Sequence, residues 1–208
     1  MMRRKCKKWL AGLLALLMVT MGFSMGDLPA SAKEISSTDW MADIPGDTML
    51  SSISIPGTHD SGTQYISLSY ILQCQDTSIQ QQLENGYRYL DMRLAIDEND
   101  DEEPVLKLIH NMGDCRTAKS IFSDKLYLDA VLSDIYGFLD EHPTETVMVV
   151  VKAENEDDSI DEFQNLLYEY INANPQYWYL QNQIQHWMMS EVRSYWRPDL
   201  MMSMNWVR

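Results

Sequence analysis

The spacing of apolar and polar residues along the chain predicts four short strands. The first alternates Ser and Ile and stops at Pro56-Gly57, which indicates a strand that ends in a turn. The last is β-branched except for Met148, which favours a strand buried on both faces, as in a parallel sheet. The four predicted strands are, in order, 52–55, 87–96, 105–110 and 146–151.

Three helices are predicted between and after these strands. The first ends at Gly86, the usual residue for a left-handed helix C-terminus, and the second ends before Pro143. An acidic run over 97–103 is typical of a solvated loop. Strands and helices therefore alternate, which predicts an α/β fold with parallel strands. The three predicted helices are 79–85, 126–141 and 160–171.

Polar side chains recur just after or late in these strands, where the site of a β/α barrel lies. His59 follows the first strand, Arg93 lies late in the second, and His110 ends the third. A pair of imidazoles can supply a general base and a general acid near neutral pH. A guanidinium offers a planar fork of donors that suits phosphate oxygens. Two histidines flanking an arginine therefore indicate phosphodiester cleavage without metal, although a buried histidine is more often structural.

The first 32 residues have the pattern of a secretory signal peptide. Five basic residues precede a short apolar run, and Ala30-Ser31-Ala32 offers the small side chains that a signal peptidase needs. The run is too short for a membrane anchor. Removing 1–32 leaves 16 − 5 = 11 Lys and Arg against 31 − 1 = 30 Asp and Glu, a net charge of −19. This field argues against nucleic acid as a partner, and we expect a secreted, extracellular protein.

Two of the three cysteines, Cys74 and Cys115, lie beyond the signal sequence. Their spacing leaves open whether they form a disulfide after export or stay free thiols. No Cys/His spacing is typical of zinc.

Four motifs resemble the catalytic X domain of phosphatidylinositol-specific phospholipase C. Residues 55–63 (IPGTHDSGT) are similar to its first signature, and 86–93 (GYRYLDMR) to its second. Residues 108–111 (LIHN) are similar to the third, and 142–152 to the family's next helix end, strand and lysine. The resemblance implies that 33–184 are the N-terminal part of a distorted (β/α) TIM-type barrel.

The resemblance also implies a mechanism and a role for each residue. His59 would take the proton of the inositol 2-hydroxyl, Arg93 would stabilise the phosphoryl oxygens, and His110 would protonate the departing diacylglycerol. Asp60 would orient His110, which completes the expected catalytic set of His59, His110, Arg93 and Asp60. Asp91 and Lys152 would bind or position the substrate: Asp91 would support Arg93 or the hydroxyl end of the site, and Lys152 would hold inositol hydroxyls.

Structural alternatives stand beside three of these roles. Asp60 could cap a turn, Asp91 could pair with Arg88, and Lys152 could be an exposed strand end. We expect no metal cofactor, because Arg93 stands where a calcium ion would neutralise the phosphate in eukaryotic relatives. The expected partner is phosphatidylinositol or glycosyl-phosphatidylinositol at a membrane surface, and the chain is expected to be a monomer. Two other functions compete: a non-catalytic inositol-phospholipid binding remnant, and a metal-dependent glycerophosphodiester phosphodiesterase.

The tail over 185–208 departs from the family pattern. It is dense in Met and Trp, and deleting one base from a family-like coding sequence reproduces 185–195. We therefore expect a one-base frameshift after Ile184. A complete barrel of this type needs roughly 250 residues, so we also expect a poorly stable chain with weak or no activity.

Overall fold

The computed structural model describes residues 36–120 and 122–179. The predicted signal peptide and the predicted frameshifted tail lie outside these residues. Within the described part, no helix combines the length and the apolar composition that crossing a membrane requires.

A mixed sheet is built around one long central strand, β2 (Tyr89–Glu98). The first half of β2 pairs in parallel with β1 (Gly57–Thr58) and with β5 (Met148–Ala153), which matches Arg93 with Lys152. Its second half pairs antiparallel with β3 (Pro104–His110), which continues to β4 (Gly113–Asp114). The α/β class is therefore confirmed, but the expectation that all strands are parallel is wrong.

The antiparallel pairing follows from the short connection between β2 and β3. Parallel neighbours need a crossover of a dozen or more residues, and only five residues separate these strands. The acidic run predicted as a loop forms the end of β2 and this turn, where the Asn99 amide donates to the Glu103 carbonyl at 3.0 Å. The Asn99 side chain accepts from the amides of Asp101 and Glu103 at 3.0 and 2.9 Å. The hairpin therefore returns β3 toward the start of β2.

The predicted strand over 52–55 is also wrong. Leu50–Ser52 forms a 3-10 helix, and pairing with β2 begins only at Pro56, whose carbonyl accepts from the amides of Arg88 and Tyr89 at 2.9 and 3.1 Å. Alternation over four residues cannot distinguish a strand from an extended segment that lacks a hydrogen-bonding neighbour. Gly57 then meets Tyr89 so closely that a Cβ would lie 2.9 Å from the Tyr89 carbonyl oxygen.

The predicted helices are confirmed with small shifts of their ends. In α3 (Ile79–Glu84), Ser78 and Gln81 form a reciprocal capping box, and Gly86 follows the helix at a φ of +96°. The longer helices are α4 (Leu128–Glu141) and α5 (Ile160–Ala173). Short helical segments complete the chain: α2 (Ser69–Leu72) and 3-10 helices at Trp40–Asp43, Thr63–Tyr65 and Pro175–Tyr177.

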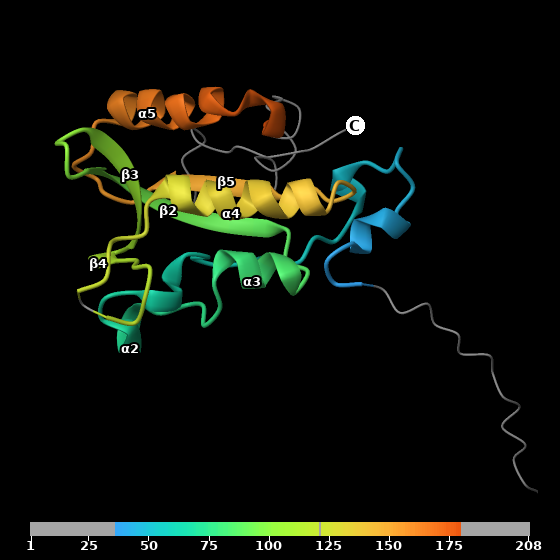
Figure 1. Cartoon of the computed structure of the whole chain (residues 1–208), viewed down its shortest axis with the longest axis horizontal. Helices are drawn as coiled ribbons and strands as arrows, with labels where there is room; N and C mark the ends of the chain where they lie inside the picture. Colours follow the sequence, from blue (N-terminus) through green and yellow to red (C-terminus); the bar gives the residue numbers. More distant parts are fainter. Residues whose placement is uncertain (1–35, 121, 180–208) are drawn as a thin grey trace, which may run out of the picture. The chain divides into compact units, whose positions relative to one another are not determined.

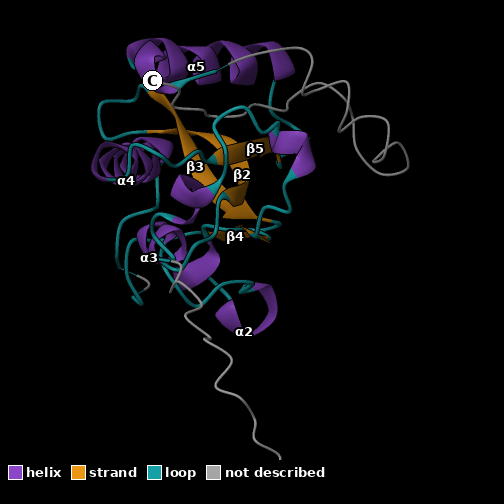
Figure 2. Cartoon of the chain, turned by 90° about the vertical axis from the view of Figure 1, so that its right-hand side faces the viewer, coloured by secondary structure: helices purple, strands orange, loops and turns teal. Residues whose placement is uncertain are grey.

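Helix α4 covers one face of the sheet and lies between α3 and α5 (Figures 1 and 2). Its apolar side is buried at every third or fourth residue, as in Leu128, Val131, Leu132 and Ile135. These side chains join one core with β2, β3, β5 and the inner faces of α3 and α5. The core holds β2 in place, and the polar side chains of β2 form the floor of the site described next.

Candidate functional site

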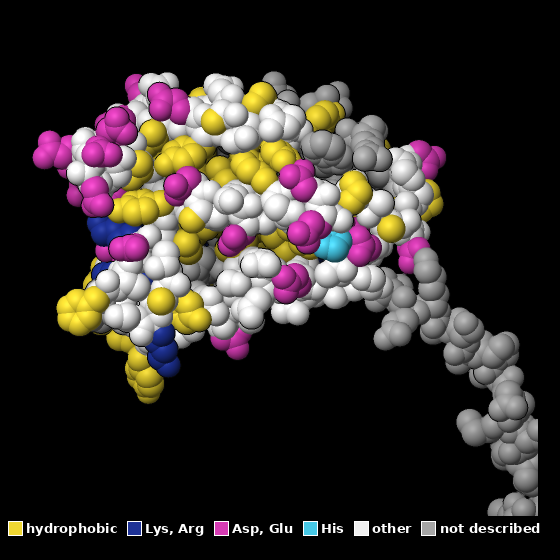
Figure 3. Space-filling model, viewed as in Figure 1, with side chains coloured by type: hydrophobic (Ala, Val, Ile, Leu, Met, Phe, Trp, Pro, Cys, Tyr) yellow, Lys and Arg dark blue, Asp and Glu magenta, His cyan; other side chains and the backbone are white. Residues whose placement is uncertain are grey.

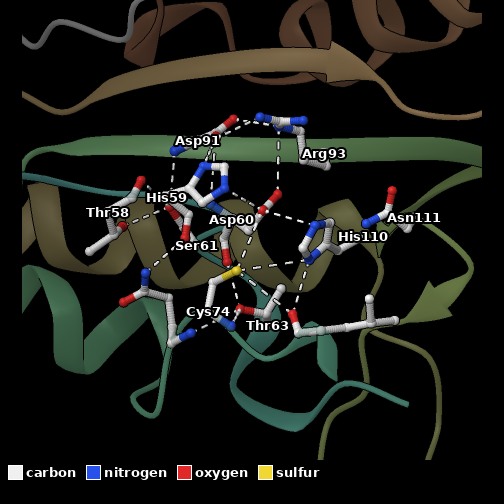
Figure 4. Close-up of polar contacts among 12 residues, drawn as sticks. Thr58, His59, Asp60, Ser61, Thr63, Cys74, Asp91, Arg93, His110 and Asn111 are labelled. Carbon is white, nitrogen blue, oxygen red and sulfur yellow. Dashed lines mark hydrogen bonds and ion pairs between the residues drawn. The ribbon is translucent and has the colours of Figure 1, made fainter. Parts of the chain in front are cut away.

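The loop after β1 places His59 and Asp60 beside the middle of β2 (Figure 4). Asp60 adopts a left-handed conformation, with a φ of +46°, that Asp tolerates better than most residues. The next amide, that of Ser61, donates to the Asp91 carbonyl at 2.9 Å, and the Ser61 hydroxyl accepts from the Asp91 amide at 2.9 Å. A buried Gln82 donates to the Ser61 carbonyl at 2.8 Å. This network fixes the loop against β2.

Arg93 is held by a carboxylate on its own strand, that of Asp91, and by one just after β5, that of Glu154. Its Nε and Nη2 atoms donate to the two oxygens of Asp91 at 2.8 and 3.1 Å, and Nη1 donates to Glu154 at 3.2 Å. Burial alone would lower the pKa of Arg93, but the hydrogen bonds and charges of Asp91 and Asp60 raise it. For the carboxyl of Asp91, burial favours a raised pKa, but Arg93 and His59 lower the pKa overall. Both groups therefore stay ionised, and the predicted support of Arg93 by Asp91 is present in the structure.

Asp60 lies between the two histidines. Its Oδ2 atom is 2.9 Å from His59 Nε2 and 3.3 Å from His110 Nε2, and the two rings are 6.3 Å apart between centroids. We predicted a contact with His110 alone, and the structure adds His59. The other oxygen, Oδ1, is buried without a hydrogen-bond partner, although Arg93 Nε lies 3.6 Å away.

The second nitrogen of each ring also has a defined partner. His59 Nδ1 lies 2.9 Å from Asp91 Oδ2, so both of its nitrogens face carboxylate oxygens. His110 Nδ1 lies 3.0 Å from the Leu72 carbonyl, which only accepts hydrogen bonds, so this nitrogen carries a proton. His110 is therefore oriented with Nε2 toward the site. His59 is 65% exposed in its side chain and His110 only 16%, so His59 is the more accessible of the two.

Lys152 reaches the same site from β5, beside Arg93. Its ammonium contacts Glu154 at 2.7 Å, and its side chain is 42% exposed. The sequence-based prediction omitted Glu154, which also accepts from Arg93 and from the Asn111 amide at 3.3 Å. The signal was present, because Glu154 lies two residues after Lys152 and side chains two apart on an extended chain share a face.

Cys74 is a second residue that sequence reasoning did not place here. Its Sγ lies 3.6 Å from Asp60 Oδ2 and 3.9 Å from His110 Nδ1. Burial, the charge of Asp60 and a hydrogen bond to it raise the pKa of this thiol. Cys74 and Cys115 are both free, so the structure holds the free-thiol alternative. Nothing in the sequence pattern indicated that Cys74 would meet the histidines.

The alternative pairing of Asp91 with Arg88 is not what the structure shows. Arg88 is fully buried just before β2 and pairs with Glu145 at 2.9 Å. Asp91 instead pairs with Arg93 and His59 in the site.

These features define an α/β protein in which histidines from two other segments meet the carboxylate and the arginine of the central strand, in a site suited to an anionic ester. The model of the family PI-PLC X 1 matches residues 46–188. The chain belongs to this family, which confirms the resemblance drawn from the four motifs.

Two curated relatives and one solved structure are similar to part of this chain. A 1-phosphatidylinositol phosphodiesterase of Listeria monocytogenes is 30% identical over 150 residues, which are 70% of this chain and 41% of the relative. One from Staphylococcus aureus is 26% identical over 179 residues, which are 84% of this chain and 50% of the relative. The solved structure of phosphatidylinositol-specific phospholipase C from Listeria monocytogenes has a TM-score of 0.56 at 31% identity, over 70% of this chain and 48% of that one.

The chain thus spans about half the length of the relatives it matches. The solved relatives are barrels of the TIM type, and the described residues form part of such a barrel. The predicted fold class is confirmed in this sense.

Proposed function

We propose that the site cleaves the phosphodiester of phosphatidylinositol to give diacylglycerol and inositol 1,2-cyclic phosphate. The observation that carries the proposal is the shared carboxylate: Asp60 contacts both histidines, and Arg93 lies beside it. This arrangement supplies two proton-transfer groups and one fixed positive charge around a single small volume. The names of the relatives, 1-phosphatidylinositol phosphodiesterase, support the substrate class.

His59 is proposed as the general base. In neutral His59 the Nδ1 proton points to Asp91, and Nε2 takes the proton of the inositol 2-hydroxyl once that hydroxyl replaces the 2.9 Å contact of Nε2 with Asp60. The alkoxide attacks phosphorus, and the bond to the diacylglycerol oxygen breaks. Asp60 then stabilises the imidazolium that forms, much as a buried carboxylate does in a catalytic triad.

His110 is proposed as the general acid. Its Nε2 proton, held toward Asp60, passes to the departing diacylglycerol oxygen. Arg93 donates to the phosphoryl oxygens as charge builds on them. Lys152 is proposed to hold inositol hydroxyls, and Glu154 to position both cations.

We propose that this chemistry needs no metal cofactor. Arg93 already places a permanent positive charge next to Asp60 and Asp91, where a phosphate has to be neutralised. A competing metal-dependent phosphodiesterase would lose activity in EDTA, which makes chelator resistance a direct test.

We propose phosphatidylinositol or glycosyl-phosphatidylinositol in a membrane surface as the substrate of a secreted monomer. Large apolar side chains are exposed on and just before α2 and in the loops after β3 and β4, and Figure 3 shows apolar groups on the surface at the corner where α2 lies. Helix α2 is joined to the site by the contact of His110 with the Leu72 carbonyl. Exposed apolar groups next to a catalytic site favour approach to a lipid surface. The exposed residues are Leu68, Tyr70, Ile71, Met112 and Phe122.

The test is an assay on phosphatidylinositol micelles in EDTA, with the cyclic phosphate followed by phosphorus NMR. It compares the chain with a version whose reading frame is restored after residue 184, each with a His59→Ala control. Cyclic phosphate from the restored version alone supports the proposal and the frameshift. Product from both shows that the described half suffices. No product from either refutes catalysis and favours a lipid-binding remnant.

A further inference from the structure

A second set of contacts in the site has the composition of a metal centre. A ring nitrogen of His59, an oxygen of Asp60 and the sulfur of Cys74 all lie within 4.8 Å of one another. The proposed mechanism uses the first two and has no role for the thiol. His110 borders the same group through its 3.9 Å approach to Cys74.

The separations suit a small tetrahedral ion. Bonds of about 2.3 Å to sulfur and about 2.0–2.2 Å to nitrogen or oxygen place tetrahedral ligands roughly 3.3–3.8 Å apart. From Asp60 Oδ2, Cys74 Sγ at 3.6 Å lies within this range and His59 Nε2 at 2.9 Å lies below it, while the ligand atoms of His59 and Cys74 are within 4.8 Å of each other. Side-chain adjustments within about 1 Å would therefore form the site, and His59 and Cys74 are both exposed enough to admit an ion.

The surroundings are also those of a metal ligand. A metal-binding histidine usually gives its other ring N–H to a carboxylate, which orients it. Asp91 Oδ2 holds His59 Nδ1 at 2.9 Å in this way, and the ring thereby presents Nε2 to Asp60. The charged groups around the centre are the carboxylates of Asp60, Asp91 and Glu154 and the cations of Arg93 and Lys152. Their sum is one negative charge before the thiol ionises, which favours a cation.

We propose that His59, Asp60 and Cys74 bind one divalent, thiol-seeking cation such as Zn²⁺ or Cd²⁺. The ion replaces the proton of the Cys74 thiol and any proton on His59 Nε2, and both are released to solvent. Because bound metal occupies the lone pair of His59, it would also inhibit the cleavage; this second part rests on the proposed function. The ion is an inhibitor here, and the cleavage itself needs none.

Binding is tested with the metal alone. Cadmium is titrated into the full chain, and the thiolate-to-cadmium absorption in the ultraviolet is followed together with the heat of binding. Each cysteine is replaced in turn: Cys74→Ser removes the proposed ligand, while Cys6→Ser and Cys115→Ala are matched controls. Circular dichroism checks that each variant keeps its fold.

We expect one ion per chain, with affinity at least about tenfold weaker in Cys74→Ser and His59→Ala and unchanged in the two control variants. Asp91→Asn should weaken binding roughly 10–100-fold, as loss of an orienting partner does. Equal affinity in Cys74→Ser, or loss of the absorption with a control variant, would overturn the site.

Inhibition is tested separately on the same micelles. Addition of Zn²⁺ to the active protein should stop cyclic phosphate formation, and EDTA should restore it. If metal binds as expected but no version of the protein has activity, the site stands and only the proposed function fails. If Zn²⁺ binds and activity persists at saturation, the inhibitory role is refuted.

Discussion

The fully buried Arg88 offers the sharpest test of how this fold is held together. Its Nε pairs with Glu145 at 2.9 Å. Its other nitrogens donate to the carbonyl of Leu83 in α3 and to those of Ser37 and Thr38, in the entry segment that precedes the first 3-10 helix. The guanidinium carbon lies 4.5 Å above the Phe138 ring. Glu145 in turn accepts from the Met41 amide at 3.0 Å. The pair therefore joins the entry segment, β2 and the start of β5.

Replacing Glu145 with Leu leaves this guanidinium buried and without its counter-charge. Removing one partner of a buried ion pair costs about 3–5 kcal/mol, against a typical total stability of 5–15 kcal/mol. Burial raises the pKa of Glu145 and lowers that of Arg88, so desolvation outweighs their attraction. Removing both charges should then cost less than the two single changes together, by about 0.5–3 kcal/mol.

Urea unfolding followed by circular dichroism measures these costs. With a slope of about 1–3 kcal/mol per molar urea, a loss of 3 kcal/mol moves the midpoint down by roughly 1–3 M. The cycle consists of Arg88→Met, Glu145→Leu and the double variant. Asp39→Asn is the control, since its pair with His142 is partly exposed and should contribute no more than about 1 kcal/mol. Additive costs, or a loss below about 1 kcal/mol in Glu145→Leu, would refute the reasoning.

Three further predictions concern other parts of the molecule. Burial favours a raised pKa for Asp97, but Lys125 and Lys107 lower the pKa overall. The ionised carboxylate should therefore stabilise the fold above about pH 4, and this stabilisation should be lost as the pH falls further. The unfolding free energy of Asp97→Asn should lack this pH dependence, and equal pH profiles for the two proteins would contradict the prediction. Gly57→Ala should lower the unfolding free energy by about 1–3 kcal/mol, because its Cβ would lie 2.7 Å from Tyr89 Cβ; an unchanged urea midpoint would show that β1 can shift. Arg93→Lys should reduce kcat about 10²–10³-fold with a smaller effect on KM, since an ammonium cannot hold Asp91 and a phosphate in two directions; a change confined to KM would assign Arg93 to binding alone.

Local signals in the sequence were sufficient for much of the fold. Gly86 and Pro143 located the ends of two helices, because both residues act on the conformation of neighbouring backbone groups. The direction of β3 was mistaken because strand composition carries no direction, although the predicted gap over 97–104 was already too short for a parallel crossover. The strand at 52–55 failed because its pairing partner begins only at Pro56.

The residues of the site divide in the same way. The motifs around His59, Arg93 and His110 were visible in the sequence by themselves, and the two-residue spacing of Lys152 and Glu154 at the end of β5 was also readable, although it was not used. The meeting of Asp60 with both histidines, and of Cys74 with all three, was decided only by tertiary structure. This meeting depends on the β2–β3 hairpin, which returns His110 toward the loop after β1, and on the left-handed backbone conformation of Asp60. Contacts between segments so far apart in sequence form only once the core has fixed β2.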